Sequence, residues 1–389
     1  MPRPTAPIYL DHNAGAPLRD SVRETMIAVL GDAGNASSVH AHGRRARGRI
    51  EAAREQVARL CGARSRAVTF VSGGTEANMT ALSPAWQDQG APIYLDKLFR
   101  SAVEHPSVIT GGRFPVADQT VLAVDEAGRV RLDLLEEVVK DAEPSLISVM
   151  AANNETGVIQ PLREIGEIAG KYGHFFHVDA VQAAGRMTID MEAWQADVLT
   201  LSAHKFGGPQ GIGAVVLRST ARVPAPLMVG GGQENWRRGG TENVAAIAGF
   251  GVAAQAALEE SADTRHLAEM KARLETGLRS VCPATVIYGV SALRLANTSC
   301  FAVPGIPAET ALIALDLEGI SVSSGSACSS GKVSVSHVLT AMGVEEDLAR
   351  CALRISMGWN TRAADIDRLL DLWPRIVDRL NPEARHRAA

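Results

Sequence analysis

Residues 146–182 read LISVMAANNETGVIQPLREIGEIAGKYGHFFHVDAVQ, which is a short apolar run, a helical pattern and a second short apolar run in succession. The alternation continues around this stretch, with apolar runs at 67–72, 197–204 and 211–218 and a helical pattern at 75–86. Strands that alternate with single helices form right-handed crossovers and a mainly parallel sheet with helices on both faces. The sequence therefore predicts an α/β fold, in which ligands bind beyond the carboxyl ends of the strands.

A long helical stretch, from about Glu242 to Val281, separates this sheet from a second group of elements. Three strand-like runs, NTSCFAV (297–303), ISVSSG (320–325) and ALRISM (352–357), alternate there with helical patterns. This order indicates a compact second domain. The N-terminal run IYLDHN (8–13) has no evident partner in the sequence and could belong to either unit.

The composition is that of an ordinary globular protein, with 389 residues, 46% of them hydrophobic and 21% charged. A formal net charge of -4 gives no basic field for a polyanion, so we expect no nucleic-acid partner. The N-terminus lacks the apolar run of a secretory signal, and no stretch reaches the roughly 18 apolar residues of a membrane span. We therefore expect a cytoplasmic protein without membrane contact.

The chain holds five cysteines and no CxxC pair, so neither a disulfide framework nor a zinc knuckle is indicated. Cys61 closes an apparent helix, and Cys300 and Cys351 lie in or beside apolar strand-like runs, which suits structural cysteines. Cys328 differs, because it lies in SSGSACSSGK (323–332), where hardly any apolar neighbour could bury it. This setting predicts an exposed loop and a chemical role for Cys328.

Four short patterns resemble familiar sites but do not match them. The histidine pair at 40–42 has no further ligands at recognisable intervals, so we expect no permanent metal site. The glycines and lysine of 325–332 have five residues between the glycines, where a phosphate-binding P-loop has four. The glycine pair at 211–213 lacks the third glycine of a dinucleotide fingerprint, and SAHK (202–205) lacks the companion motifs of serine acylases.

Chemically useful groups follow three of the predicted strands. The turn at 73–75 (Gly-Gly-Thr) opens a helix, whose free N–H groups favour a phosphate. Asp179 ends an apolar strand, where a lone carboxylate is costly, so we expect a cationic partner; a helix cap or structural salt bridge is the alternative. Lys205 also follows an apolar strand and suits an amine nucleophile with a lowered pKa, although an isolated lysine there is more often a surface residue.

Together these groups match the needs of pyridoxal phosphate, which are a phosphate cradle, a carboxylate for the pyridinium nitrogen and a lysine for the Schiff base. His105, in VEHPSV (103–108), could lie over the cofactor ring and exchange protons near neutral pH. The alternative is a histidine that caps a turn. The sequence thus predicts a site for pyridoxal phosphate.

The order and context of these residues resemble the cysteine desulfurases of the class V aminotransferase group, the family of NifS and IscS. The resemblance covers almost the whole chain. Its motifs are IYLDHNA (8–14), GNASS (34–38), SGGTEAN (72–78), VEHPSV (103–108), NNETG (153–157), HVDAVQAAG (177–185), SAHK (202–205), GGGQE (230–234), RRGGTEN (237–243), SSGSACSSG (323–331) and LRISMG (353–358).

This resemblance implies a pyridoxal phosphate-dependent transferase of fold type I. Such a fold has a large domain with a mainly parallel seven-stranded sheet and a smaller α+β C-terminal domain. On this basis we expect the large domain at residues 16–257 and the small domain at 1–15 and 258–389, with a mobile cysteine loop at about 323–334.

The resemblance also implies roles for individual residues. Lys205 would form the Schiff base, Asp179 would pair with the pyridinium nitrogen, and His105 would stack on the ring and assist proton transfer. Cys328 would be the nucleophile and sulfur carrier, and transient iron–sulfur contact through it is the one metal contact left open. The implied binding residues are Gln182 and Asn154 near the phenolic oxygen, Gly74, Thr75, Ser202 and His204 at the phosphate, Thr241 at the phosphate of the other subunit of a homodimer, and Asn154 and Arg354 at the substrate.

A few positions depart from the family pattern. The start is DHNAGA (11–16), Ala36 replaces a proline, Gln210 replaces a lysine, and Asn235-Trp236 replaces a basic residue and a glycine. None of these changes removes a catalytic group. They bear instead on substrate fit and on partner specificity.

The predicted reaction converts L-cysteine into L-alanine and a persulfide on Cys328, from which a sulfur-acceptor or iron–sulfur scaffold protein takes the sulfur. An aminotransferase or a selenocysteine lyase on the same scaffold is the alternative enzyme. A cofactor-free binding scaffold is the alternative from another class, and Lys205, Asp179 and His105 argue against it. Sequence does not distinguish among acceptors.

Overall fold

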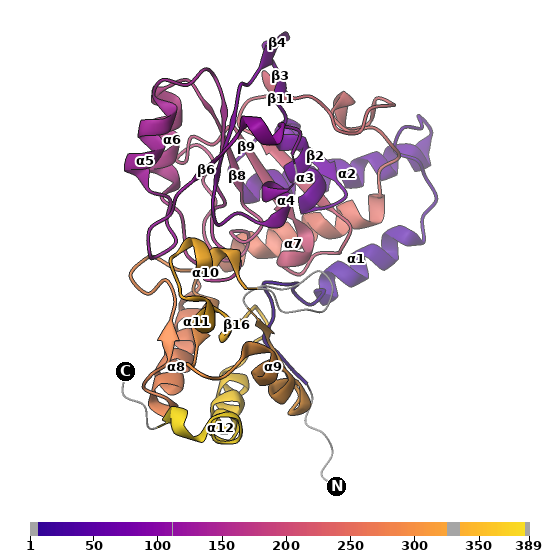
Figure 1. Ribbon diagram of the computed structural model, residues 1–389. Helices are drawn as coiled ribbons and strands as arrows, with labels where there is room; N and C mark the ends of the chain where they lie inside the picture. The colour runs from indigo at the N-terminus through magenta and orange to yellow at the C-terminus, as the bar shows by residue number, and fades with distance from the viewer. Residues whose placement is uncertain (1–6, 111, 325–334, 386–389) are drawn as a thin grey trace.

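The computed structural model of the protein describes residues 7–110, 112–324 and 335–385, and it has a larger and a smaller body (Figure 1). A seven-stranded sheet with the order β2-β10-β9-β8-β7-β5-β6 forms the centre of the larger body. Only β10 runs antiparallel to its neighbours, so the mainly parallel sheet predicted from the sequence is confirmed. The strands are β2 (Val68–Val71), β5 (Leu98–Ser101), β6 (Gln119–Leu122), β7 (Leu146–Ser148), β8 (Phe175–Asp179), β9 (Val198–Ser202) and β10 (Gly213–Leu217).

Helices cover this sheet, and an apolar core fills the space between them and the strands. The central strands β8, β9 and β10 are buried along their whole length, as expected for a sheet with two covered faces. In Figure 1, α5 and α6 lie at one end of the sheet, and α1, α2 and α7 lie together at the other. The helices are α1 (Asp20–Leu30), α2 (Ala41–Leu60), α3 (Gly74–Ala81), α4 (Pro106–Ile109), α5 (Leu132–Val139), α6 (Leu162–Lys171) and α7 (Val244–Ser261).

Short elements complete the larger body. A three-stranded sheet projects from its top in Figure 1 and has the order β11-β3-β4. Its strands are β3 (Ala85–Asp88), β4 (Ala91–Tyr94) and β11 (Arg222–Pro224). The 3-10 turns among the described residues are η1 (Ser65–Ala67), η2 (Val116–Asp118), η3 (Ala203–Lys205), η4 (Gln233–Trp236) and, near the C-terminus, η5 (Pro382–Arg385).

The smaller body is built on a four-stranded antiparallel sheet with the order β12-β13-β16-β15 and has its own apolar core. The N-terminal strand β1 (Ile8–Tyr9), whose partner the sequence left open, pairs in parallel with β14 (Ile320–Ser321) of this body. The remaining strands are β12 (Val286–Ile287), β13 (Thr298–Ala302), β15 (Ser323–Ser324) and β16 (Ala352–Ser356). The helices are α8 (Arg265–Val281), α9 (Ala308–Leu317), α10 (His337–Ala341), α11 (Glu346–Ala349) and α12 (Ala363–Leu380).

The structure corrects two helix predictions. The helical run expected at 75–86 ends at Ala81, because Pro84 cannot continue a helix and the residues after it form β3. The continuous helix expected from about 242 to 281 is broken between α7 and α8. There the Asp263 carboxylate accepts a hydrogen bond from the backbone N–H of Arg265, a local turn that competes with helix.

The domain division stays a prediction, and its boundary at residue 257 falls within α7, near the C-terminal end of that helix. Within the described ranges, the helices include none with both the length and the apolar character needed to cross a bilayer. The carboxyl ends of β8 and β9, which carry Asp179 and Ser202, are adjacent in the sheet. That edge holds the predicted site.

Candidate active site

Asp179 is the last residue of β8 and is only 5% exposed. One carboxylate oxygen accepts a hydrogen bond from the side-chain amide of Asn78 at 2.8 Å, and the other accepts from the backbone N–H of Val181 at 3.0 Å. The sequence predicted a cationic partner for this carboxylate. Among the described residues, the groups that donate hydrogen bonds to it are neutral instead. A carboxylate held in this way is fixed in place and keeps its charge available to a ligand.

Lys205 lies in η3, directly after β9, and is half buried. Its Nζ donates hydrogen bonds to the carbonyl oxygens of Asn13 at 2.7 Å and Ala14 at 2.9 Å. Burial, followed by the positive charges of Arg186 and Arg354, lowers the pKa of the Lys205 amine to about 8. Roughly a tenth of this lysine is thus the free amine at pH 7, far more than for an ordinary lysine, and the free amine is the form that a nucleophile requires.

The predicted phosphate turn lies against the end of β9. Gly74 begins α3, and a Cβ atom on it would lie 3.3 Å from Cβ of the buried Ser202, so a larger residue would crowd this contact. Thr75 follows it and is exposed. The first N–H groups of α3 have no partners within the helix and lie beside Ser202, which is an arrangement suited to an anion.

Arg238 links a distant segment to the same helix. Its guanidinium pairs with the Glu76 carboxylate at 3.0 Å, and Glu76 also accepts a hydrogen bond from the backbone N–H of Ser72 at 2.7 Å. Thr241, three residues after Arg238, is exposed. Thr241 therefore lies on the surface, close in the chain to Arg238, which contacts the helix that begins at the phosphate turn.

His105 caps the short helix α4, as the alternative interpretation of the sequence proposed. Its Nδ1 accepts a hydrogen bond from the backbone N–H of Ser107 at 3.1 Å, while much of the ring is accessible. Partial burial is the largest influence on the imidazole and lowers its pKa, while the nearby negative charge of Asp179 opposes this shift. A capping role and a place beside Asp179 and Lys205 are therefore compatible.

Arg354 on β16 is almost completely buried and is held in one position. It donates hydrogen bonds to the carbonyl oxygen of Asn154 at 3.0 Å and to the carboxylate of Asp11 at 2.7 Å. Its Nε atom is buried without a hydrogen-bond partner in the described structure. The arginine and Asn154, whose side chain is half buried, are thus brought together from the two bodies.

Gln182 is anchored by residues that the sequence reasoning missed. Its amide nitrogen donates to the carbonyl oxygen of Asn13 at 3.0 Å, and its amide oxygen accepts from Arg186. Arg186 is buried and also donates to the carbonyl oxygens of His12 at 3.1 Å and Lys205 at 3.0 Å. Arg186 directly follows HVDAVQAAG, but its burial and its contacts with Lys205 and Gln182 are visible only in the structure.

Asn13, also missed, connects the two bodies. Its amide nitrogen donates to Thr298 at 2.9 Å and to the carbonyl oxygen of Asn154 at 3.1 Å.

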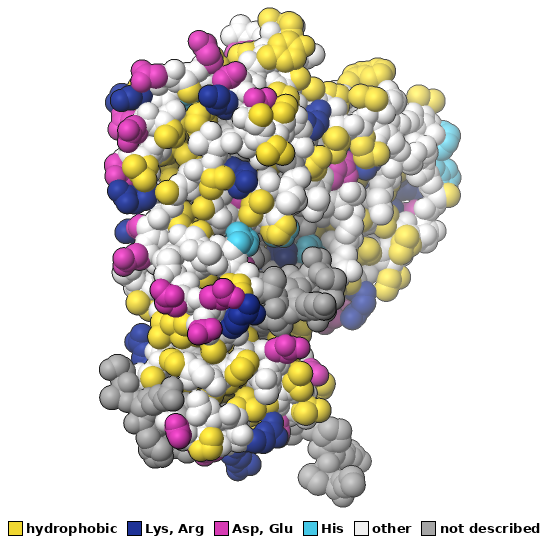
Figure 2. All heavy atoms as spheres, in the orientation of Figure 1, with side chains coloured by type: hydrophobic (Ala, Val, Ile, Leu, Met, Phe, Trp, Pro, Cys, Tyr) yellow, Lys and Arg dark blue, Asp and Glu magenta, His cyan; other side chains and the backbone are white. Residues whose placement is uncertain are grey.

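His204 follows β9, at the edge of the sheet that carries Asp179 and Lys205, and is half buried. Burial lowers the pKa of its imidazole to about 4, so the ring is neutral at physiological pH. Figure 2 shows histidine side chains gathered in the middle of the visible face, where the larger body meets the smaller one.

Comparison with known proteins decides the family. The model of the aminotransferase class-V family matches residues 8–369. The cysteine desulfurase IscS of Dictyoglomus turgidum is 39% identical over 381 residues, which cover 96% of this chain and 95% of that protein. This chain belongs to the cysteine desulfurases of the class-V aminotransferase family.

Solved structures of relatives have the same fold. A NifS-like protein from Rickettsia africae superimposes with a TM-score of 0.85 at 36% identity, covering 96% of this chain and 99% of that one. A structure described as SspA in complex with cysteine superimposes with a TM-score of 0.74 at 28% identity, covering 90% and 98% of the two chains. The predicted fold and family are thereby confirmed.

The cysteines of this desulfurase fall into two groups. Cys61, Cys282, Cys300 and Cys351 are buried and form no disulfide. Burial raises the pKa of Cys61 to about 12 and also raises the pKa of Cys300 and Cys351, so these three are poor nucleophiles. Cys328 lies outside the described residues.

Within the described ranges, no group of three or more histidine, cysteine or acidic side chains could hold a metal ion.

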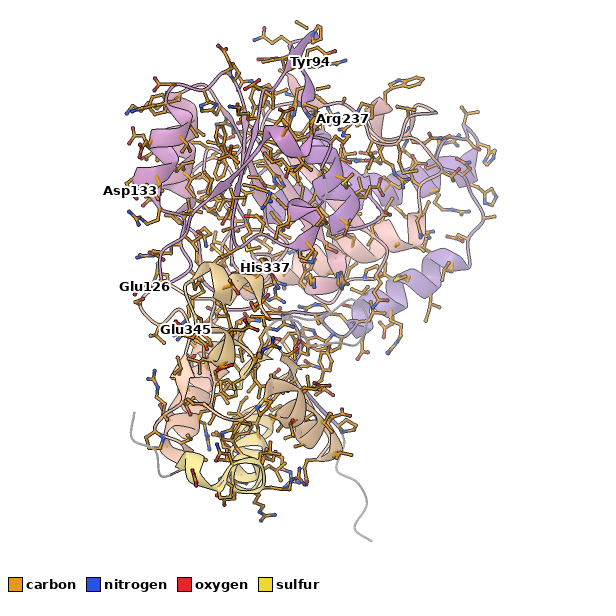
Figure 3. The ribbon with its side chains drawn as sticks, viewed as in Figure 1. Tyr94, Glu126, Asp133, Arg237, His337 and Glu345 are labelled. Carbon is orange, nitrogen blue, oxygen red and sulfur yellow. The ribbon has the colours of Figure 1, made fainter. Side chains whose placement is uncertain are left out.

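Glu155, next to Asn154, is a buried carboxyl group with one well-defined partner. It accepts a hydrogen bond at 2.5 Å from Ser336, the residue that caps α10. Burial raises the pKa of Glu155 to about 7, and Ser336 and the charge of Arg354 limit the rise. Figure 3 labels His337 at the start of α10, where this helix meets the larger body. Glu155 therefore joins the two bodies at a titratable contact.

Replacement of Glu155 by glutamine is expected to flatten the dependence of stability on pH. The pKa of this carboxyl is higher in the folded chain, about 7, than its ordinary value of 4.5, so the folded state binds the proton more tightly. Stability conferred by Glu155 is thus greatest below pH 4.5 and declines until the pH exceeds about 7, by up to about 3 kcal/mol. Glutamine cannot ionise and lacks this decline.

Thermal midpoints of the wild type and the Glu155→Gln variant, measured from about pH 5 to 8, test this expectation. The midpoint of the variant should gain on that of the wild type as the pH rises. Glu345, which is exposed and labelled in Figure 3, supplies the control variant Glu345→Gln, which should follow the wild type. Parallel curves for all three proteins would contradict the assignment of a high pKa to Glu155.

Proposed function

We propose that this chain removes the sulfur of L-cysteine, releases L-alanine and holds the sulfur as a persulfide on Cys328 until an acceptor takes it. One observation carries the proposal: Lys205, with its lowered pKa, follows β9, next to β8, which ends in the buried carboxylate of Asp179. The choice of substrate is supported by the family to which this chain belongs and by the relative whose structure is described as a complex with cysteine.

The described residues fit pyridoxal phosphate. The Asp179 carboxylate, held by neutral donors, would pair with the protonated ring nitrogen, and the Lys205 amine would join the aldehyde. Gly74, Thr75 and Ser202 would hold the phosphate at the start of α3, where a Cβ on Gly74 would crowd Ser202. His204 would complete the phosphate site, and His105 and Gln182 would contact the ring. When bound, this cofactor withdraws electrons from the substrate Cα.

The residues of the chain divide the remaining work. Arg354 and Asn154 would bind the substrate carboxylate; the guanidinium is already oriented by Asp11 and by the Asn154 carbonyl oxygen. Lys205, once released as a free amine, would take the Cα proton, for which a pKa of about 8 is well suited.

Cys328 would act as a thiolate on the substrate sulfur. A sulfur–sulfur bond forms, the carbon–sulfur bond of cysteine breaks, and the carbon takes up a proton to become the methyl group of alanine. The carbon is reduced by two electrons and the sulfur pair is oxidised by two, so no external oxidant is needed. The sum is L-cysteine plus enzyme thiol giving L-alanine plus enzyme persulfide.

The same proposal includes a homodimer and a sulfur acceptor. Thr241 is exposed beside the Arg238–Glu76 ion pair, and a Thr241 from a second copy would complete the phosphate site. A sulfur-acceptor or iron–sulfur scaffold protein would receive the persulfide sulfur. We further place the protein in the cytoplasm, where reducing conditions keep thiols free.

Product analysis separates this function from its alternatives. The holoenzyme is incubated with L-cysteine, and alanine, keto acid and protein-bound sulfur are measured. A desulfurase yields alanine and bound sulfur in equal amounts during the first turnover, whereas an aminotransferase yields the keto acid and no bound sulfur. A parallel assay with L-selenocysteine gives the ratio of kcat/KM values, and a ratio strongly in favour of selenocysteine would identify a selenocysteine lyase.

A further inference from the structure

Asn78, on the inner face of α3, is the centre of a buried hydrogen-bond chain. Its amide nitrogen donates to Asp179 at 2.8 Å and to the Ser107 hydroxyl at 2.9 Å, and its amide oxygen accepts from the Thr200 hydroxyl at 2.6 Å. An ionised carboxylate only accepts hydrogen bonds, so the NH₂ group of Asn78 must face Asp179. The charge of Asp179 therefore fixes which way this amide points.

The adjacent carboxyl group does not compete for this role. Glu104 is fully buried, and burial followed by the nearby Asp179 raises its pKa well above the ordinary value. Glu104 is therefore harder to ionise than an ordinary glutamate. One oxygen of Glu104 accepts a hydrogen bond from the backbone N–H of Met150 at 2.7 Å, which keeps it in its own place.

One arm of the chain runs from Asn78 into the sheet. The Thr200 hydroxyl gives its only proton to Asn78, so it must accept from Nε2 of His177, 3.1 Å away. Burial lowers the pKa of His177 to about 4, so the ring is neutral and its Nδ1 must accept from the Ser148 hydroxyl at 2.9 Å. Every donor and acceptor in this arm is thus assigned.

The other arm reaches His105. The backbone N–H of Ser107 donates to Nδ1 of His105 at 3.1 Å, so this nitrogen is an acceptor. The Ser107 hydroxyl, which accepts from Asn78, lies 2.8 Å from the same Nδ1 and therefore directs its own proton at it. Two donors therefore occupy Nδ1, and the neutral imidazole must carry its proton on Nε2.

We propose that Asn78 and Ser107 are positioning residues that hold His105 as the neutral tautomer with its proton on Nε2, in a direction set by the charge of Asp179. The proposal deepens the proposed function, on which it rests, by assigning a role to His105. In this tautomer His105 donates one hydrogen bond from Nε2 and has no lone pair to act as a base. Proton exchange at the substrate then falls to Lys205.

This role differs from the proton-transfer role implied for His105 by the family resemblance. Protonation at Nδ1 would require His105 to give up the backbone N–H of Ser107, and with it the cap of α4, and would reverse its hydrogen bond with the Ser107 hydroxyl. The charged or titratable groups that influence His105 are Asp179, Lys205 and His337, which come from β8, η3 and α10. The Lys205 and His337 charges disfavour the imidazolium, while Asp179 favours it.

Nitrogen NMR of the holoenzyme with ¹⁵N-labelled histidine tests the proposal. The signals of His105 are identified by their loss in the His105→Gln variant. In the wild type, His105 is expected to show a protonated Nε2 and an unprotonated Nδ1 from about pH 6 to 8. A proton on Nδ1, or conversion to the imidazolium as in a free histidine, would overturn the proposal.

Ser107→Ala removes the hydroxyl donor and keeps the backbone donor to Nδ1, so the preference of His105 for the tautomer protonated on Nε2 should weaken and a form protonated on Nδ1 should become detectable. kcat should fall on the order of tenfold with little change in KM, as for the loss of one positioning hydrogen bond. Ser107→Thr should restore both properties. The control Ser101→Ala removes another fully buried serine hydroxyl, at the end of β5, and should leave His105 unchanged.

Equal spectra and kinetics for Ser107→Ala and Ser101→Ala would also overturn the proposal. The NMR measurement is independent of the proposed function. If the holoenzyme produced no alanine but His105 kept its proton on Nε2, the proposed function would fail and the hydrogen-bond chain would stand. The reverse result would leave the desulfurase function intact and remove the role assigned to Asn78 and Ser107.

Discussion

Replacement of Lys205 by alanine is expected to abolish turnover of L-cysteine, with a loss of at least about 10³-fold in kcat. The amine is the group placed to join the cofactor aldehyde, and its pKa of about 8 makes the free amine much more accessible at neutral pH than in an ordinary lysine. Treatment with borohydride should fix pyridoxal phosphate covalently to the wild type and not to the variant. Mass spectrometry of the digested proteins measures this difference directly.

Lys271 provides a matched control for this variant. Burial also lowers the pKa of Lys271 to about 8, and its Nζ donates to the carbonyl oxygen of Leu295 at 2.7 Å. Lys271→Ala should therefore retain activity and the borohydride-fixed cofactor. Activity in the Lys205→Ala variant, or cofactor fixed at Lys271, would remove Lys205 from its proposed role. A stability loss of about 1–2 kcal/mol is expected for either variant, because carbonyl acceptors lose their donor.

Replacement of Cys328 by serine is expected to separate cofactor binding from sulfur transfer. The variant should still fix pyridoxal phosphate on borohydride treatment, because Lys205 and Asp179 are unchanged. Formation of alanine and of persulfide should fall by at least about 10³-fold, since a hydroxyl is a poor nucleophile toward sulfur. Quantification of alanine and sulfide after incubation with L-cysteine provides the measurement.

Cys351→Ala is the control for that experiment. Cys351 is buried and its pKa is raised by burial, so it should make no contribution to sulfur transfer. Sulfur transfer should continue in the Cys351→Ala variant, if less stably because a buried side chain is shortened. Undiminished sulfur release from Cys328→Ser, or its loss from Cys351→Ala alone, would transfer the nucleophile role away from Cys328.

Much of the sheet could be predicted because its strands are buried on both faces and therefore appear as continuous apolar runs. The runs ending at Asp179 and Ser202 became β8 and β9, and the polar residues that follow them lie at one edge of the sheet. Polar groups at the ends of such strands are conspicuous in a sequence. This is why Asp179 and Lys205 could be selected without a structure.

The hydrogen-bond partners of these residues could not be selected in the same way. Asn78 follows Thr75 by less than one helical turn, and nothing in the local sequence says that its amide faces Asp179 and Ser107 rather than solvent. Asn13 and Arg186 meet Lys205 and Gln182 only through the tertiary fold. Contacts of this kind depend on side-chain directions that periodicity does not encode.

The errors in helix length have a similar origin. Apolar periodicity continues past Ala81 and past Ser261, although the backbone leaves the helix at both places. Pro84 gave a local warning in the first case. In the second case, the turn at Asp263 interrupts the helix, although the residues before it and after it both favour a helix. One proline and one polar side chain therefore decided boundaries that the apolar patterns could not.

Sulfur transfer from L-cysteine to Cys328 is expected within one turnover. Its most direct test is a rapid-quench experiment in which excess holoenzyme reacts with L-cysteine labelled at sulfur, followed by digestion without reducing agent. Label is expected on the peptide containing Cys328 at the same rate and in the same amount as alanine. Alanine formed without label on that peptide, or label on another cysteine, would contradict it.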